Sequence, residues 1–127
     1  MNPTPEDIAR DDAAHYKRVG FTEAMIRACK HRCSGRGVDF KWIVGQVAGM
    51  DAKYVTDRDV AYHLAVAYVE IFAPTSARNK LIEIIQMALS SDDVRGKVIS
   101  DIGHTVVDEL RQRGLWTEVA VLEDAFE

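Results

Sequence analysis

The sequence predicts a single domain built almost entirely of α-helices. Apolar residues recur at helical spacing, residues that cap or end helices separate these segments, and no segment shows the two-residue alternation of a strand. The chain has 127 residues, enough for one hydrophobic core, and neither an internal repeat nor a long linker divides it. We therefore expect residues 1–127 to form one helical bundle of six or seven helices.

Capping and stop residues mark the helix ends in the first half of the chain. Thr4, Asp39 and Thr56 each precede an apolar segment, and Thr56 has Asp59 three residues on, as in a capping box. Gly20 and Gly49 follow such segments, where glycine commonly ends a helix. The helices expected in this half cover about 5–19, 21–33, 40–48 and 57–73.

The second half is expected to hold two long helices and a short one. Thr75 or Ser76 restarts the chain after a proline, Ser90 opens the next helix, and Thr117 caps the last. The long helices cover about 76–89 and 91–113. Their predicted core faces are Ala77, Leu81, Ile84, Ile85 and Ala88 in the first, and Val98, Ile99, Ile102, Val106 and Leu110 in the second. In the short helix the stripe is Leu115, Val119, Leu122 and Phe126, and we expect Trp116 to fold back onto the bundle.

The helix expected at 57–73 is apolar on nearly every side. One face holds Val60, Leu64, Ala67, Tyr68 and Ile71, and a roughly opposite face holds Tyr62, Val66 and Val69. Such a helix must be buried on most sides, either at the centre of the domain or in a contact between subunits. We favour the central position, but both can hold, because a small bundle can complete such burial by pairing with a symmetry mate.

Composition excludes several classes of protein. The net charge of −4 and a pI near 5.5 argue against a protein that mainly coats nucleic acid. The start of the chain lacks the pattern of a signal peptide, and the longest nearly apolar run, 60–73, is too short to span a bilayer. Two cysteines are too few for a disulfide framework. We expect a cytoplasmic protein without a membrane partner.

The segment 29–33 carries Cys29, His31 and Cys33, which suggests a metal or redox site. On a helix, however, His31 points about 160° away from both cysteines, because successive residues turn by about 100°. The three side chains then cannot converge on one ion. We expect both cysteines to pack in the core beside Phe21 and Met25.

No motif indicates catalysis or cofactor binding. No nucleophile is placed beside a base and an orienting acid, and the pair Gly35 and Gly37 lacks the spacing of a phosphate-binding loop. We therefore expect no catalytic, cofactor-binding or metal-binding residue. A small helical enzyme, with an active site assembled only in three dimensions, stays the second alternative.

Charge divides along the chain. Residues 15–41 hold seven Lys or Arg against two acids, and residues 92–127 hold nine acids against four bases. Arg27 and Lys30 lie away from the apolar face of their helix, and Arg36 follows in the loop. This segment can be a solvated face, half of a protein contact or a nucleic-acid patch. A helix-turn-helix is disfavoured, because its recognition segment at 51–60 would carry three acids and the Thr56 capping box divides it.

Trp42 completes the set of candidate contact residues, because it points away from the apolar side of its short helix. We expect a non-enzymatic regulatory, inhibitory or adaptor protein that acts through another protein and forms a homodimer. Small acidic helical proteins of this kind are frequent among bacterial and phage inhibitors, which is an analogy from composition. The first alternative is a nucleic-acid-binding regulator that uses the 15–41 segment. The predicted partner-binding residues are Trp42, Arg36, Lys30, Arg27, Tyr62, Val66 and Val69.

Overall fold

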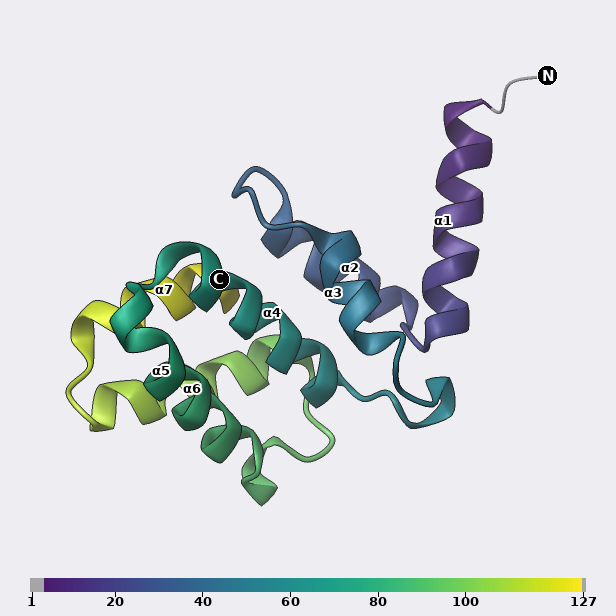
Figure 1. The fold of residues 1–127 in the computed structure, drawn as a ribbon. Coiled ribbons are helices and arrows are strands. Elements are labelled where there is room, and N and C mark those ends of the chain that lie inside the picture. The colour runs from purple at the N-terminus through teal and green to yellow at the C-terminus, as the bar shows by residue number, and fades with distance from the viewer. Residues whose placement is uncertain (1–3, 127) are drawn as a thin grey trace.

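The computed structural model describes residues 4–126, apart from the side chains of residues 5–11, 117 and 124. In this part of the chain it is all-helical and has no strand, which confirms the predicted fold class. The α-helices are Pro5–Val19 (α1), Glu23–Cys33 (α2), Phe40–Val47 (α3), Asp57–Phe72 (α4), Thr75–Leu89 (α5), Ile99–Gln112 (α6) and Trp116–Phe126 (α7) (Figure 1). Two short 3-10 helices lie at Ala52–Tyr54 (η1) and Asp92–Val94 (η2).

Local capping explains where these helices begin. The Thr22 hydroxyl accepts the Met25 amide at 3.2 Å, and the Asp39 carboxylate accepts the Lys41 amide at 2.9 Å. At the start of α4 the Thr56 amide donates to the Asp59 carboxylate at 2.9 Å. The capping box predicted at Thr56 is therefore confirmed, and it separates η1 from α4, so the segment 51–60 is not one recognition helix.

Helix α4 occupies the centre of the bundle. It packs against α2 and α3 on one side and against α5, α6 and α7 on the others, whereas α1 projects from the N-terminal edge (Figure 1). Both apolar faces of α4 are covered within one chain, which confirms the central position. Its buried residues are Val60, Ala61, Leu64, Ala65, Val66, Ala67, Tyr68 and Val69. The expectation for Ile71 is wrong, since α4 runs past its neighbours there and leaves that side chain 50% exposed.

A buried arginine joins the end of α2 to α4 and α7. Arg32 is only 9% exposed, and its guanidinium donates to the carbonyl oxygens of Ala28 at 2.9 Å and Phe126 at 3.0 Å. The Tyr68 hydroxyl of α4 donates to the Arg32 carbonyl oxygen. The Phe126 and Arg32 carbonyls lie in the last turns of α7 and α2, where helices lack internal donors, and the guanidinium places a positive charge beside the end of α7, where it is favoured.

The segment 91–98 differs from the prediction, which placed it inside a long helix. The Ser91 hydroxyl accepts the Asp93 amide at 3.2 Å and caps η2 instead, and Gly96 then adopts a φ of 72°, which is incompatible with a right-handed helix. Helix α6 therefore begins only at Ile99, and Val98, predicted in the core, is 54% exposed. Trp116 was also predicted wrongly, since it is 65% exposed.

Gly103 sets the distance between α6 and α7. A Cβ atom at this buried position would lie 2.2 Å from Cγ of Phe126, so only glycine allows the two helices this approach. We predict that Gly103→Ala lowers the free energy of unfolding by about 2 kcal/mol, because an added methyl group forces a packed core apart. Urea denaturation followed by circular dichroism measures this change.

Gly45→Ala is the matched control. Gly45 lies within α3, and a Cβ atom there would meet nothing within 4 Å. Alanine is the better helix former, so this variant should gain up to about 1 kcal/mol. Equal effects of the two substitutions would contradict the close packing of α6 on α7.

Candidate functional site

The segment 29–33 is helical and does not gather metal ligands. Cys29 and Cys33 are buried and His31 is exposed, as predicted. A hydrogen bond with Cys33 and burial together raise the pKa of the Cys29 thiol above its ordinary value. Across the part of the chain that the structure describes, no three His, Cys, Asp or Glu side chains are placed to hold a metal ion.

The basic segment 15–41 does not form one continuous patch. Arg32 is buried, and the Lys17 ammonium pairs with the Glu23 carboxylate at 2.9 Å. The Lys30 ammonium lies over the rings of Tyr16 and Phe40, 5.2 Å and 5.7 Å from their centroids. Arg27 is exposed on α2.

Arg36 turns toward α4 rather than toward Lys30. Its guanidinium lies 3.4 Å from the Tyr68 hydroxyl. Lys30 therefore packs against residues of α1 and α3 whereas Arg36 faces α4, and this separation weakens the nucleic-acid interpretation.

Tyr62, Val66 and Val69 were predicted to contact a partner subunit. The structure places Val69 wholly inside the chain, and Val66 is 8% exposed, so neither offers surface to another protein. Tyr62 is half-buried, and its hydroxyl accepts the Gln86 amide of α5 at 3.2 Å. The second apolar face of α4 is thus covered by its own chain, and the homodimer prediction loses its main support.

His63 follows Tyr62 on α4 and lines an open hollow against α5. The two rings pack edge to face with centroids 5.0 Å apart. Burial lowers the pKa of His63, against an opposing effect of Asp59, and so favours the neutral imidazole. The contacts with His63 and Gln86 hold Tyr62 between α4 and α5, so we interpret Tyr62 as a structural residue.

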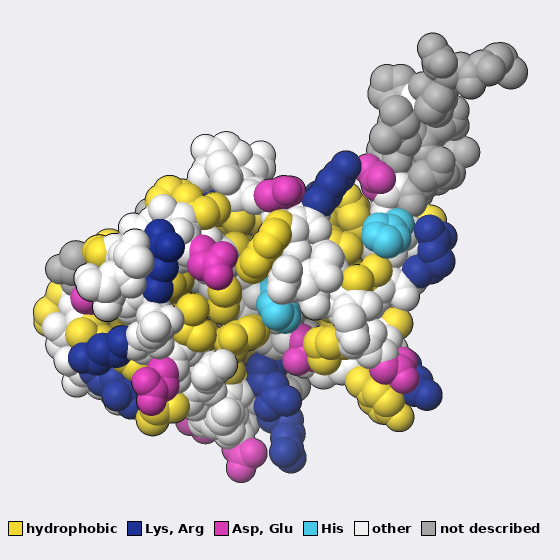
Figure 2. Space-filling view, viewed as in Figure 1, with side chains coloured by type: hydrophobic (Ala, Val, Ile, Leu, Met, Phe, Trp, Pro, Cys, Tyr) yellow, Lys and Arg dark blue, Asp and Glu magenta, His cyan; other side chains and the backbone are white. Residues whose placement is uncertain are grey.

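Trp42 lies in a groove between α3 and α4. It is half-buried and packs against the core, so the expected outward position holds only for part of its side chain. We define the α3–α4 groove by its lining residues, Gly37, Asp39, Trp42, Ala67, Glu70 and Ile71. The hollow has a volume of about 240 Å³. Figure 2 shows hydrophobic side chains gathered along α4 on this face, with acidic side chains among them.

The apolar surface of this groove continues to the end of α4. Ile71 is 50% and Phe72 is 48% exposed, and the Phe72 ring packs against Tyr68 with centroids 5.5 Å apart. Asp39 and Glu70 supply carboxylates from opposite walls. The groove thus combines an indole, exposed aliphatic surface and negative charge, a combination that can hold an apolar side chain with a positive end.

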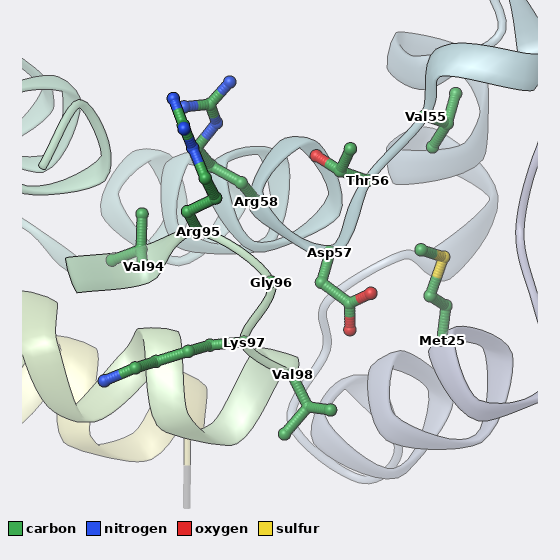
Figure 3. A pocket seen from close by; sticks show the side chains of 10 residues that line it. All are labelled: Met25, Val55, Thr56, Asp57, Arg58, Val94, Arg95, Gly96, Lys97 and Val98. Atoms are coloured by element: carbon green, nitrogen blue, oxygen red, sulfur yellow. The ribbon is translucent and has the colours of Figure 1, made fainter. Parts of the chain in front are cut away.

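A second and larger hollow lies where the loop before α6 faces the start of α4. We call it the 94–98 cleft, with a volume of about 540 Å³. Its lining residues are Met25, Val55, Thr56, Asp57, Arg58, Val94, Arg95, Gly96, Lys97 and Val98. Figure 3 shows Arg58 and Arg95 pointing to one side of the cleft, while Asp57 points the opposite way, toward Met25 and Val98.

Asp57 links the start of α4 to the start of α6. Burial raises the pKa of its carboxyl above the ordinary value, while hydrogen bonding to the backbone of Ile99 opposes that rise. Ile99 is the first residue of α6, so the carboxylate lies at a helix N-terminus, where negative charge is favoured. The cleft thus contains one partly desolvated acid whose role as a helix cap explains its position.

Comparison with protein families, characterised proteins and solved structures finds no match to this chain. Within the described residues no helix is long and apolar enough to cross a membrane. Function is therefore inferred from the α3–α4 groove and the 94–98 cleft. Trp42 was the one groove residue identified as a candidate from the sequence. Residues 94–98 were missed because the pattern placed them on a helix.

The raised pKa of Asp57 predicts a specific pH dependence of stability. The folded state holds the proton more tightly than the unfolded chain, so stability falls as pH rises through the window between the ordinary pKa of 3.8 and the raised one. Asp57→Asn keeps an oxygen that can accept the Ile99 amide but removes the titration. Relative to the natural protein, the variant should therefore be more stable at pH 7 than at pH 3.5.

Urea denaturation of both proteins at the two pH values measures this difference. Every other titrating group is common to the pair, so the difference between the two proteins isolates position 57. A stability difference that is the same at both pH values would show that the Asp57 carboxyl titrates alike in the folded and unfolded states.

Proposed function

We propose that this chain is a small non-enzymatic regulatory or adaptor protein that binds another protein through the α3–α4 groove. The observation that carries the proposal is the pairing of a half-buried Trp42 with a half-exposed Ile71 in an open groove. Tryptophan beside partly covered aliphatic surface is typical of the few residues that supply most of the binding energy of an interface.

The exposed apolar surface at the end of α4 supports this choice. Phe72 adjoins Ile71 along the helix, and both remain about half exposed although residues 64–69 just before them are buried. Removing such surface from water gains about 25 cal/mol for each Å². Burial of Ile71, Phe72 and the exposed part of Trp42 by a partner therefore contributes a favourable free energy of binding, because folding leaves this surface in contact with water.

The charge of the groove defines the chemistry of the partner. Asp39 and Glu70 line it, whereas Lys41, next to Asp39 in the sequence, lines a different hollow beside α1. Arg36 lies near the groove but points to the Tyr68 hydroxyl. We therefore assign the groove to an apolar segment that carries Lys or Arg, because opposite charges guide association and select the partner.

Most of the other residues predicted to contact a partner do not line the groove and are not part of this proposal. Lys30 packs over aromatic rings, and Val66 and Val69 are inside the fold. A homodimer through α4 is therefore no longer the preferred assembly. Binding of a different, basic protein replaces it as the proposed mode of action.

The proposal is tested with a partner captured from the native cell, identified and then purified. We predict that Trp42→Ala and Ile71→Asp each weaken its binding by at least about 2 kcal/mol, roughly thirtyfold in Kd, as expected for central contact residues. Isothermal titration calorimetry measures the affinities, and circular dichroism verifies that the variants fold.

Trp116→Ala is the matched control, because Trp116 is 65% exposed on α7 and does not line the groove. This variant should bind as the natural protein does. Asp39→Asn with Glu70→Gln should reduce binding and its dependence on salt while keeping a capping side chain at position 39. Equal affinities for the Trp42 and Trp116 variants would contradict the proposed contact.

A further inference from the structure

The 94–98 cleft has a chemistry different from that of the α3–α4 groove. Its charged lining residues are one acid and three bases, and its apolar lining comes from α2, the loop before α4 and the segment before α6. Its volume of about 540 Å³ falls in the range of small-molecule sites. The cleft therefore has the size and the mixed lining of a ligand site.

Two guanidinium groups at the cleft have no strong internal partner. Arg58 makes no ion pair with any described residue, and Arg95 meets only Asp92, at 3.7 Å, in a pair that is almost fully exposed. No ion pair within the described chain joins Asp57 to either arginine, and Figure 3 shows the two side chains directed away from it. Two arginines that share one side of a cleft favour an oxyanion, which guanidinium groups bind through parallel N–H donors.

Apolar side chains line the side of the cleft opposite the two guanidinium groups (Figure 3). Val98 is 54% exposed although it lies between buried Val94 and Ile99 in the chain, and Val55 on the facing wall is half-buried. Gly96, with its φ of 72°, turns the chain so that residues 94–98 follow the cleft rather than continue a helix. The backbone thus places Arg95 and Val98 at the same hollow, with their side chains on opposite sides of it.

We infer that the 94–98 cleft binds a small amphipathic oxyanion, a carboxylate or phosphate monoester that carries a short aliphatic chain. The oxyanion lies against the guanidinium groups of Arg58 and Arg95. The aliphatic chain covers Val98 and Val55. This site is separate from the α3–α4 groove and does not depend on the function proposed for that groove.

The test is titration calorimetry at low salt with four probes, namely octanoate, octyl phosphate, inorganic phosphate and octyl glucoside, each below its micelle concentration. Octanoate or octyl phosphate should bind at least about tenfold more tightly than either inorganic phosphate or octyl glucoside, because only the first two supply both the charge and the chain. The stronger of these two shows which oxyanion the site prefers.

Variants separate the cleft from general charge effects. The double variant Arg58→Gln with Arg95→Gln should weaken the binding of the amphipathic anions by about tenfold or more in Kd. This is the loss expected when charge-assisted hydrogen bonds are removed. Arg18→Gln with Arg27→Gln changes the net charge equally at exposed positions outside the cleft and should have no effect. Val98→Ser should weaken the binding of octanoate but leave the binding of inorganic phosphate unchanged.

Three results would overturn the inference. The first is an absence of binding by both amphipathic anions. The second is an equal loss of affinity for the amphipathic anions in the two double arginine variants, which would indicate nonspecific attraction of anions. The third is equal binding of octanoate and octyl glucoside, which would indicate an apolar surface without an anion site.

Discussion

Helix α4 must bury apolar side chains on nearly every side, and this constraint organises most of the bundle. Five of the other helices pack around it, and its residues from Val60 to Val69 are covered except at Tyr62 and His63. Because one chain suffices for this burial, α4 does not need a second subunit. The surface available to a partner then lies where the cover ends, at Ile71 and Phe72.

Three other contacts hold the helices together around α4. Arg32 holds the ends of α2 and α7 together while its carbonyl accepts the Tyr68 hydroxyl of α4. Gly103 lets α7 approach α6 closely enough for Phe126 to be buried. Asp57 places the first turn of α4 against the first residue of α6. Each contact joins segments distant in the sequence, so none of them leaves a local pattern.

This difference between local and distant effects decides how much the sequence could predict. The starts of α2, α3 and α4 follow from residues within a few positions, such as Asp39 and the Thr56 capping box, so periodicity and capping predicted them within two residues. The burial of Arg32 depends on Phe126 of α7 and Tyr68 of α4, whereas Val98 is exposed because Gly96 interrupts the predicted helix. The burial of Arg32 was therefore not predicted, and Val98 was predicted to lie in the core.

The candidate sites were less accessible to sequence analysis than the fold. Trp42 was identified from its position on α3, but Asp39, Glu70 and Ile71 join it only because α3 packs beside α4. The 94–98 cleft depends on Gly96, whose left-handed conformation ends a segment that periodicity assigned to a helix. The α3–α4 groove and the 94–98 cleft differ in charge, because carboxylates line the first and mainly bases line the second.

We conclude that one chain buries α4 completely enough for the fold to be stable as a monomer. Amide hydrogen exchange measured over a hundredfold range of protein concentration tests it directly. We predict that the amides of α4 exchange slowest in the molecule, at rates that do not change with concentration. Protection of residues 60–69 that disappears on dilution would contradict it, because it would show that a second copy supplies the missing cover.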